Sequence, residues 1–91
     1  MDLEKILNSA INRKILRFFD ENPYCIDTAK GIAAWTGLAI STAQKALKNL
    51  VISNLLIEHK TASTLGYAYT QNKMMVKNIK HWLAKADENT T

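Results

Sequence analysis

The sequence predicts a single α+β domain over residues 1–91, and the domain is mainly α-helical. Three observations support this fold class. A chain of 91 residues has enough apolar surface for one core. Its apolar residues recur at steps of three and four over most of its length, which is the period of an amphipathic helix. Between residues 56 and 70, a polar turn with a glycine separates two short stretches of strand-forming residues, which predicts a β-hairpin.

The first third of the sequence predicts two helices. Apolar residues recur at helical spacing over about 2–7 and again over about 10–21. Ser9 lies between these stretches and is expected to cap the longer helix. Pro23 disfavours the α conformation in the residue before it, so the longer helix should end there and residues 24–26 should be extended.

A third helix is expected over residues 28–36. Asp27 precedes it and can accept a hydrogen bond from the free amide groups of its first turn. Trp35 is expected to face the core with the other apolar residues of this helix, in place of serving as a base-stacking platform. Gly37 suits the left-handed conformation at a C-terminal cap.

A fourth helix follows after only a few residues. Ser41 and Gln44 have the spacing of a capping box, in which each side chain bonds the backbone amide of the other residue. The helix is therefore expected over about 42–53, with Asn54 at its C-terminal cap. Two helices joined by so short a turn have the pattern of a helix-turn-helix.

The last third predicts the hairpin and one more helix. Tyr67 and Tyr69 alternate along the second strand, so both are expected to pack on the helices. Asn72 is expected to cap a helix over about 73–86. The polar tail over 87–91 is expected to fray.

Charge is distributed unevenly along the chain. Residues 1–29 carry four basic and five acidic side chains, whereas residues 30–85 carry eight lysines and one acid, Glu58. A field of one sign attracts polyanions, among which nucleic acid is the first candidate and an acidic membrane surface or protein partner the next. The alternative is a lysine-rich face that only keeps the protein in solution.

Several classes of function are not expected. The single cysteine, Cys25, cannot form an internal disulfide or a thiolate zinc site, and His59 is expected on a hairpin strand without a metal. The sequence has no phosphate-binding loop, metalloprotease, nucleophile-elbow or paired-carboxylate motif, so we expect no enzyme, cofactor or metal. It also has no signal peptide and no apolar run of membrane-spanning length, which predicts a cytoplasmic protein without membrane contact.

The order of these elements resembles a known family. Residues 11–19 resemble the opening helix of the winged helix-turn-helix transcriptional regulators of bacteria and archaea, of the ArsR and MarR kind. Residues 31–50 are similar to their positioning helix, turn and recognition helix, and residues 55–70 resemble their wing. The resemblance implies a three-helix core with a β-hairpin wing and a C-terminal helix. The sequence departs from the metal-sensing members, which carry paired cysteines or Asp/His pairs, so metal sensing is not expected.

The resemblance also implies that the helix at about 42–53 enters the major groove of DNA and that the hairpin at about 56–70 contacts the backbone. The residues expected to contact DNA are Ser41, Thr42, Gln44, Lys45, Lys48, Asn49 and Lys60. Glutamine and asparagine can pair with adenine, threonine can touch a thymine methyl group, and lysine can reach guanine or phosphate. The predicted function is sequence-selective binding of double-stranded DNA by a small transcription regulator. The alternative is a winged helix that docks a protein partner without reading bases.

The last helix is expected to form a homodimer interface. Met75, Ile79, Trp82 and Leu83 recur at helical steps and offer more apolar surface than one small core needs. A two-fold dimer would place its recognition helices about one DNA turn, ~34 Å, apart. The alternative is that this helix only closes the core of its own chain.

Overall fold

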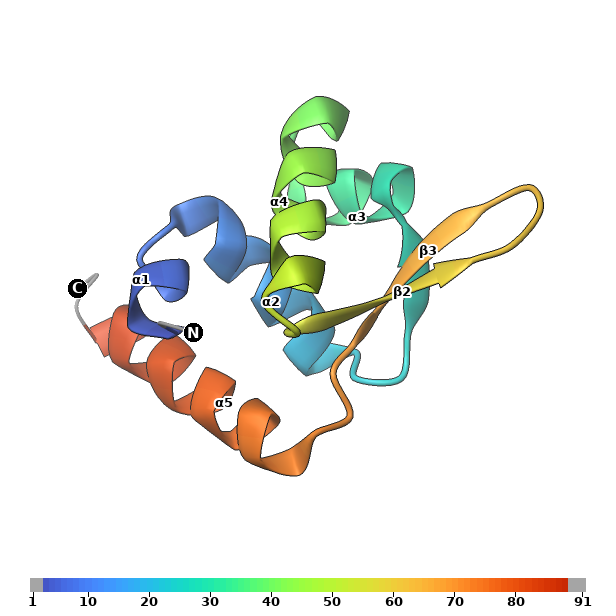
Figure 1. Ribbon diagram of the computed structural model, residues 1–91. Helices are drawn as coiled ribbons and strands as arrows, with labels where there is room; N and C mark the ends of the chain where they lie inside the picture. The colour runs from blue at the N-terminus through green and yellow to red at the C-terminus, as the bar shows by residue number, and fades with distance from the viewer. Residues whose placement is uncertain (1–2, 89–91) are drawn as a thin grey trace.

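The computed structural model describes residues 3–88, and it confirms the predicted α+β class (Figure 1). The elements of this part of the chain are α1 (Leu3–Leu7), α2 (Ala10–Glu21), β1 (Ile26–Thr28), α3 (Ala29–Thr36), α4 (Ile40–Ile52), β2 (Leu56–Lys60), β3 (Leu65–Tyr69) and α5 (Lys73–Glu88). Figure 1 shows α2, α3 and α4 in the middle of the molecule and α5 along its lower edge beside α1. The β2–β3 hairpin extends away from the helices to one side.

The link between α1 and α2 follows the prediction. Ser9 caps α2, and its Oγ accepts a hydrogen bond from the backbone N of Asn12 at 3.3 Å. The Asn12 side-chain amide donates to the Ile6 carbonyl at 2.9 Å, and the Arg13 guanidinium donates to the Leu7 carbonyl at 2.8 Å. These bonds satisfy carbonyl groups at the end of α1, so they hold a helix of only 5 residues against α2.

The starts of α3 and α4 differ from the predicted ones. Thr28 caps α3, since its Oγ1 accepts a hydrogen bond from the Gly31 amide, whereas Asp27 lies in β1 and accepts one from the Thr28 amide. The α4 helix begins at Ile40 after Ala39, whose side chain makes no capping bond. The predicted capping box is therefore wrong.

The turn between α3 and α4 explains the earlier start of α4. Gly37 adopts the predicted left-handed conformation with φ 75°, and its amide donates to the Ala33 carbonyl at 2.9 Å. The Ala43 amide already donates to the Ala39 carbonyl at 2.9 Å, so the helix is under way before Ser41. At the other end, Asn54 has φ 63° and lies one residue beyond the C-cap, Ser53.

Trp35 was predicted to lie in the core, and this prediction is wrong, because its side chain is 75% exposed. The buried side of α3 is defined by Ile32 and Ala33. A helix turns by about 100° per residue, so Trp35 lies well to the side of these two residues. Its ring centroid is 6.1 Å from that of the half-buried Phe18, and the indole therefore covers an edge of the core.

The sheet contains a third strand at Ile26–Thr28, where only an extended segment at 24–26 was expected, and Tyr24 lies in a turn instead. In the structure this strand is β1, which pairs antiparallel with β3, and β3 pairs with β2. Tyr67 and Tyr69 are both buried, as predicted. Tyr69 stacks on Phe19 of α2 with ring centroids 6.2 Å apart, which anchors the central strand to the helices.

The core lies between the helices and the base of the hairpin. Its buried side chains include Ile15, Leu16, Phe19, Ile32, Leu47, Leu50, Leu55, Tyr69, Ile79 and Leu83. Asn72 caps α5 as predicted, because its Oδ1 accepts a hydrogen bond from the Met75 amide at 3.1 Å. The helix continues to Glu88, and residues 89–91 lie outside the described residues, so a frayed tail over 87–91 stays a prediction.

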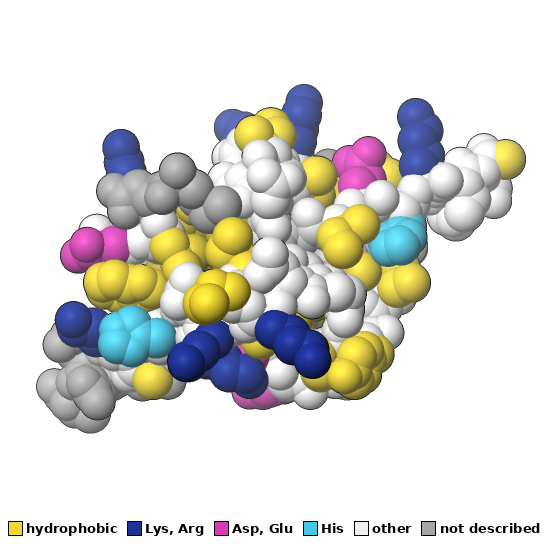
Figure 2. All heavy atoms as spheres, turned by 60° about the horizontal axis from the view of Figure 1, so that its bottom comes forward, with side chains coloured by type: hydrophobic (Ala, Val, Ile, Leu, Met, Phe, Trp, Pro, Cys, Tyr) yellow, Lys and Arg dark blue, Asp and Glu magenta, His cyan; other side chains and the backbone are white. Residues whose placement is uncertain are grey.

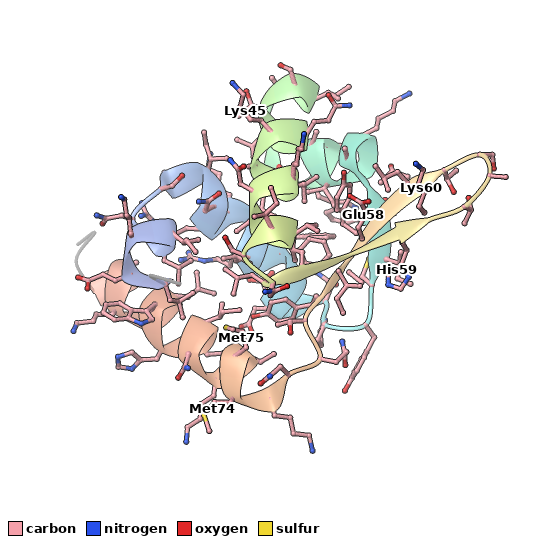
Figure 3. All side chains as sticks on the ribbon, viewed as in Figure 1. Lys45, Glu58, His59, Lys60, Met74 and Met75 are labelled. Carbon is pink, nitrogen blue, oxygen red and sulfur yellow. The ribbon has the colours of Figure 1, made fainter. Side chains whose placement is uncertain are left out.

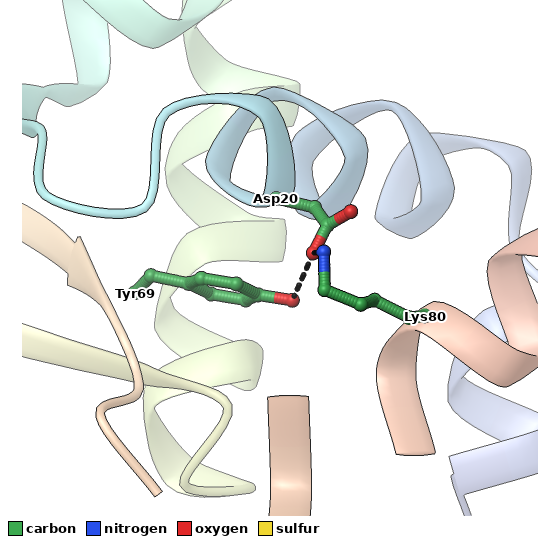
Figure 4. Close-up of polar contacts among 3 residues, drawn as sticks. All are labelled: Asp20, Tyr69 and Lys80. Carbon is green, nitrogen blue, oxygen red and sulfur yellow. Dashed lines mark hydrogen bonds and ion pairs between the residues drawn. The ribbon is translucent and has the colours of Figure 1, made fainter. Parts of the chain in front are cut away.

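Asp20 joins α2 to the sheet and to α5 (Figure 4). Its Oδ1 accepts a hydrogen bond from the Tyr69 hydroxyl at 3.4 Å and forms an ion pair with Lys80 Nζ at 2.8 Å. Burial, together with the negative charge of Asp20 and this hydrogen bond, raises the pKa of Tyr69 above its usual value. The single carboxylate thus connects α2 to β3 and α5, two consecutive elements that lie far from α2 in the sequence.

Candidate nucleic-acid interface

The α4 helix presents one polar face to solvent. Its buried side consists of Ala43, Ala46, Leu47 and Leu50. Opposite them lie Ser41, Lys45, Lys48 and Ile52, which follow one another at steps of three or four residues and are all exposed. The helix contains no acidic residue, so this face is positively charged.

The two flanks of this face differ. Gln44 lies on one flank with Ile40 one turn before it, and both are exposed. Thr42 and Asn49 lie on the other flank, where α4 and the start of α2 enclose a groove of about 380 Å³. The groove is lined by Ser9, Ile11, Asn12, Ser41, Thr42, Lys45, Ala46 and Asn49. The predicted contact residues of α4 are therefore all exposed except the half-buried Thr42, which lies with Asn49 at the edge next to α2.

The predicted contact on the hairpin, Lys60, is exposed at the end of β2. Alternation along the strand places Glu58 on the same side as Lys60 and His59 on the opposite side, as Figure 3 shows. Burial raises the pKa of Tyr67, and the negative charge of Glu58 raises it further. The Glu58 carboxylate therefore adds negative charge to the side of the hairpin that carries Lys60.

Comparison with known proteins identifies the fold. The sequence matches no protein-family model and no curated protein. The crystal structure of AntR, an antimony-specific transcriptional repressor, matches with a TM-score of 0.75 and 15% identity, covering 97% of this chain and 77% of that one. The homodimeric winged helix-turn-helix DNA-binding domain of Mb0332 from Mycobacterium bovis, a possible ArsR-family transcriptional regulator, matches with a TM-score of 0.74 and 20% identity, covering 94% and 76%. NadR in complex with 4-hydroxyphenylacetate matches with a TM-score of 0.66 and 14% identity, covering 97% and 67%.

The chain has a winged helix-turn-helix fold. The fold implied by the sequence resemblance is thereby confirmed, with α3 and α4 as the helix-turn-helix and the β2–β3 hairpin as the wing. In this fold α4 occupies the position of the recognition helix, which is the helix with the acid-free polar face.

Seven of the eight lysines in residues 30–85 fall into two groups, and the eighth, Lys30, lies on α3. Lys45, Lys48 and Lys60 lie on the recognition helix and the wing. A second group on α5 consists of Lys73, Lys77, Lys80 and Lys85. Figure 1 shows α4 and α5 on opposite sides of α2, and Figure 2 shows Lys and Arg side chains both along the upper edge of the view and on its lower side. The positive charge counted along the sequence is thus divided between two surfaces.

The four residues of α5 that were predicted to form the dimer interface differ in their burial. Ile79 and Leu83 are only 0% and 5% exposed in the core of their own chain, so for these two the prediction is wrong. Their helical spacing places both side chains on the side of α5 that packs against the chain's own core. Met75 and Trp82 are half-buried. Trp82 borders a hollow of about 250 Å³ between α1 and α5, and Lys85 Nζ lies 5.1 Å from the centre of its ring.

Sequence reasoning missed two apolar residues on the exposed part of α4. Ile40 is 46% exposed and Ile52 is 69% exposed. Both were overlooked because only polar side chains were considered as contacts. Helical phase could have found Ile52, which lies eleven residues after Ser41 and therefore on the same face.

Among the side chains of residues 3–86, no three His, Cys, Asp or Glu are grouped so that they could hold a metal ion. In the same part of the chain, no helix has both the length and the apolar character needed to cross a bilayer.

Proposed function

We propose that this protein binds double-stranded DNA sequence-selectively and regulates transcription. The observation that carries the proposal is the exposed, polar and acid-free face of α4, the helix in the recognition position of a winged helix. The likeness to AntR, described as a transcriptional repressor, and to Mb0332, described as a DNA-binding domain, supports the proposal. No residue is assigned a catalytic role.

The recognition helix lies in the major groove in this proposal, and its first two turns reach the base edges. Ser41 and Gln44 are exposed near this end and hydrogen-bond to bases. Lys45 and Lys48, at the centre of the face, contact guanine acceptors or phosphate. Lys60 contacts the DNA backbone from the wing.

Thr42 and Asn49 contact the edge of the DNA groove. Both line the groove between α4 and the start of α2, together with Ser9. A strand of the duplex that enters this groove meets hydroxyl and amide groups, which are typical partners of sugar and phosphate oxygens. These contacts set the orientation of α4 and leave base reading to Ser41, Gln44 and the two lysines of the helix.

We further propose that the working unit is a homodimer formed through α1 and the adjoining side of α5. The partly covered apolar residues of these two helices include Leu3, Ile6, Met75 and Trp82. The homodimeric state described for the Mb0332 domain supports this arrangement. A two-fold axis would bring two recognition helices to successive major grooves, about 34 Å apart.

Selection of binding sites from random duplexes tests DNA binding, and two double variants of equal charge change identify the surface. Lys45→Gln with Lys48→Gln removes two charges from α4, and Lys73→Gln with Lys77→Gln removes two from α5. The α4 pair is expected to weaken binding to the selected duplex by about tenfold or more, and the α5 pair to leave it within about twofold. Equal losses in both pairs would refute the assignment to α4, and the absence of any bound duplex would refute DNA binding.

The exposure of Trp35 favours a second candidate, a winged helix that docks a protein partner. Tryptophan is enriched at the centres of protein interfaces, and this indole is 75% exposed beside the turn that leads into α4. A selection that enriches no duplex would favour this candidate over DNA binding.

A further inference from the structure

The N-terminal end of α4 carries an apolar side chain in its first turn. Because the helix starts at Ile40 and is preceded by Ala39, its first exposed side chains are those of an alanine, an isoleucine and a serine. Ile40 is 46% exposed, although isoleucine is among the residue types most often buried. This side chain therefore belongs to the surface that the proposed function turns toward the major groove.

Ile40 is a neighbour of Gln44 on the surface of the helix. Side chains four residues apart lie one above the other, with Cβ atoms about 5–6 Å apart. Both residues are exposed, and both lie in the first two turns, the part of a recognition helix that approaches base edges. The two side chains can therefore contact the same base pair or two adjacent ones.

An A·T pair offers two features in the major groove that match these side chains. Adenine N6 and N7 bind the amide of a glutamine through two hydrogen bonds, and thymine carries a 5-methyl group that an aliphatic side chain can contact. We propose that Ile40 and Gln44 together select A·T pairs, Gln44 by bonding to adenine and Ile40 by contact with the methyl group of thymine in the same or the next pair. This inference rests on the proposed DNA binding and adds to it the chemical class of the target, a thymine-containing half-site.

Deoxyuridine substitution tests the methyl contact, because uracil differs from thymine only in lacking the 5-methyl group. Each thymine of the selected duplex is replaced in turn, and the affinity is measured by fluorescence anisotropy. At the contacted thymine, the wild-type protein is expected to lose affinity about threefold to fivefold, as for one methyl-sized group left exposed to water. Ile40→Ala is expected to bind the parent duplex and the duplex substituted at that thymine equally. Ile52→Ala, which shortens the isoleucine at the other end of α4, is expected to keep the wild-type ratio.

The measurement on wild-type protein does not depend on the folding of any variant. If the wild type binds every substituted duplex as tightly as the parent, or if Ile40→Ala keeps the wild-type ratio, the inference is wrong and DNA binding stands. A ratio lost in Ile52→Ala and kept in Ile40→Ala would move the contact to the other end of the helix and overturn the inference. If no duplex is bound at all, the proposed function itself fails.

Discussion

Asp20 is the shared partner of two contacts, so its replacement tests what holds α2, the sheet and α5 together. Its Oδ1 accepts the Tyr69 hydroxyl hydrogen bond at 3.4 Å and lies 2.8 Å from Lys80 Nζ. Asp20→Ala removes both contacts. Tyr69→Phe removes only the hydrogen bond, and Lys80→Gln removes only the ion pair.

The expected costs follow from the exposure of each group. The Lys80 side chain is 57% exposed, so water screens its ion pair, and Lys80→Gln should lower the free energy of unfolding by less than about 1 kcal/mol. Tyr69 is 1% exposed, and after Asp20→Ala its hydroxyl would be buried without an acceptor, at a cost of about 1–3 kcal/mol. Tyr69→Phe removes the donor together with a long hydrogen bond, so it should cost about 1 kcal/mol or less.

Urea unfolding followed by circular dichroism gives these free energies. In a domain of this size, 1 kcal/mol corresponds to a shift in Tm of about 4–8 °C. Asp20→Asn serves as the matched control, because it removes the charge and keeps an acceptor oxygen for Tyr69, and it should cost as little as Lys80→Gln. If Lys80→Gln destabilises the fold as much as Asp20→Ala, the reasoning from the buried hydroxyl is refuted.

Four other predictions concern pH, salt, charge and assembly. The raised pKa of Tyr69 keeps its hydroxyl protonated in the folded chain, so its contribution to the free energy of unfolding should be fully present below about pH 10 and be lost as the pH rises further. Urea titrations at pH 9 and 11 should therefore show a smaller loss of stability in Tyr69→Phe than in the wild type. If the three lysines of α4 and the wing contact phosphates, a plot of log affinity against log salt concentration should have a slope of about −3 per chain. A slope near −6 would mean that the lysines of α5 contact phosphates as well. Glu58→Gln should strengthen binding to all duplexes alike in competition assays, because it removes negative charge beside Lys60; weaker binding would contradict this placement. Trp82→Ala should sediment as a folded monomer, and an unfolded variant would assign Trp82 to the core.

Local signals predicted the parts of the fold that depend on a few neighbouring groups. Ser9, Gly37 and Asn72 form caps where expected, because each cap involves only backbone groups within a few residues. The capping box at Ser41 failed although its spacing was correct. The tight turn after Gly37 allows α4 to start at Ile40, so Ser41 lies inside the helix and cannot cap it.

Non-local structure could not be read from the sequence in the same way. The pairing of Ile26 with Ala68 joins residues that are far apart in the chain, so β1 was expected only as an extended segment. The α3 helix has 8 residues, too few for apolar spacing to fix which side Trp35 occupies. On α5, the spacing of Ile79 and Leu83 has the same period whether they face their own core or a partner, and only the packing of the chain distinguishes the two.

The division of lysines between α4 and α5 changes how specificity would arise. A count along the sequence placed a large positive charge over residues 30–85, but only Lys45, Lys48 and Lys60 belong to the proposed interface. Few phosphate contacts mean weak non-specific binding, since that binding comes almost entirely from the electrostatic contribution. Base contacts near the start of α4 must then supply a larger share of the affinity, and a second chain that doubles the contacts becomes more important. The proposed homodimer and the proposed reading of A·T pairs by Ile40 and Gln44 are therefore linked, because an interface of low charge needs both to distinguish its site from other DNA.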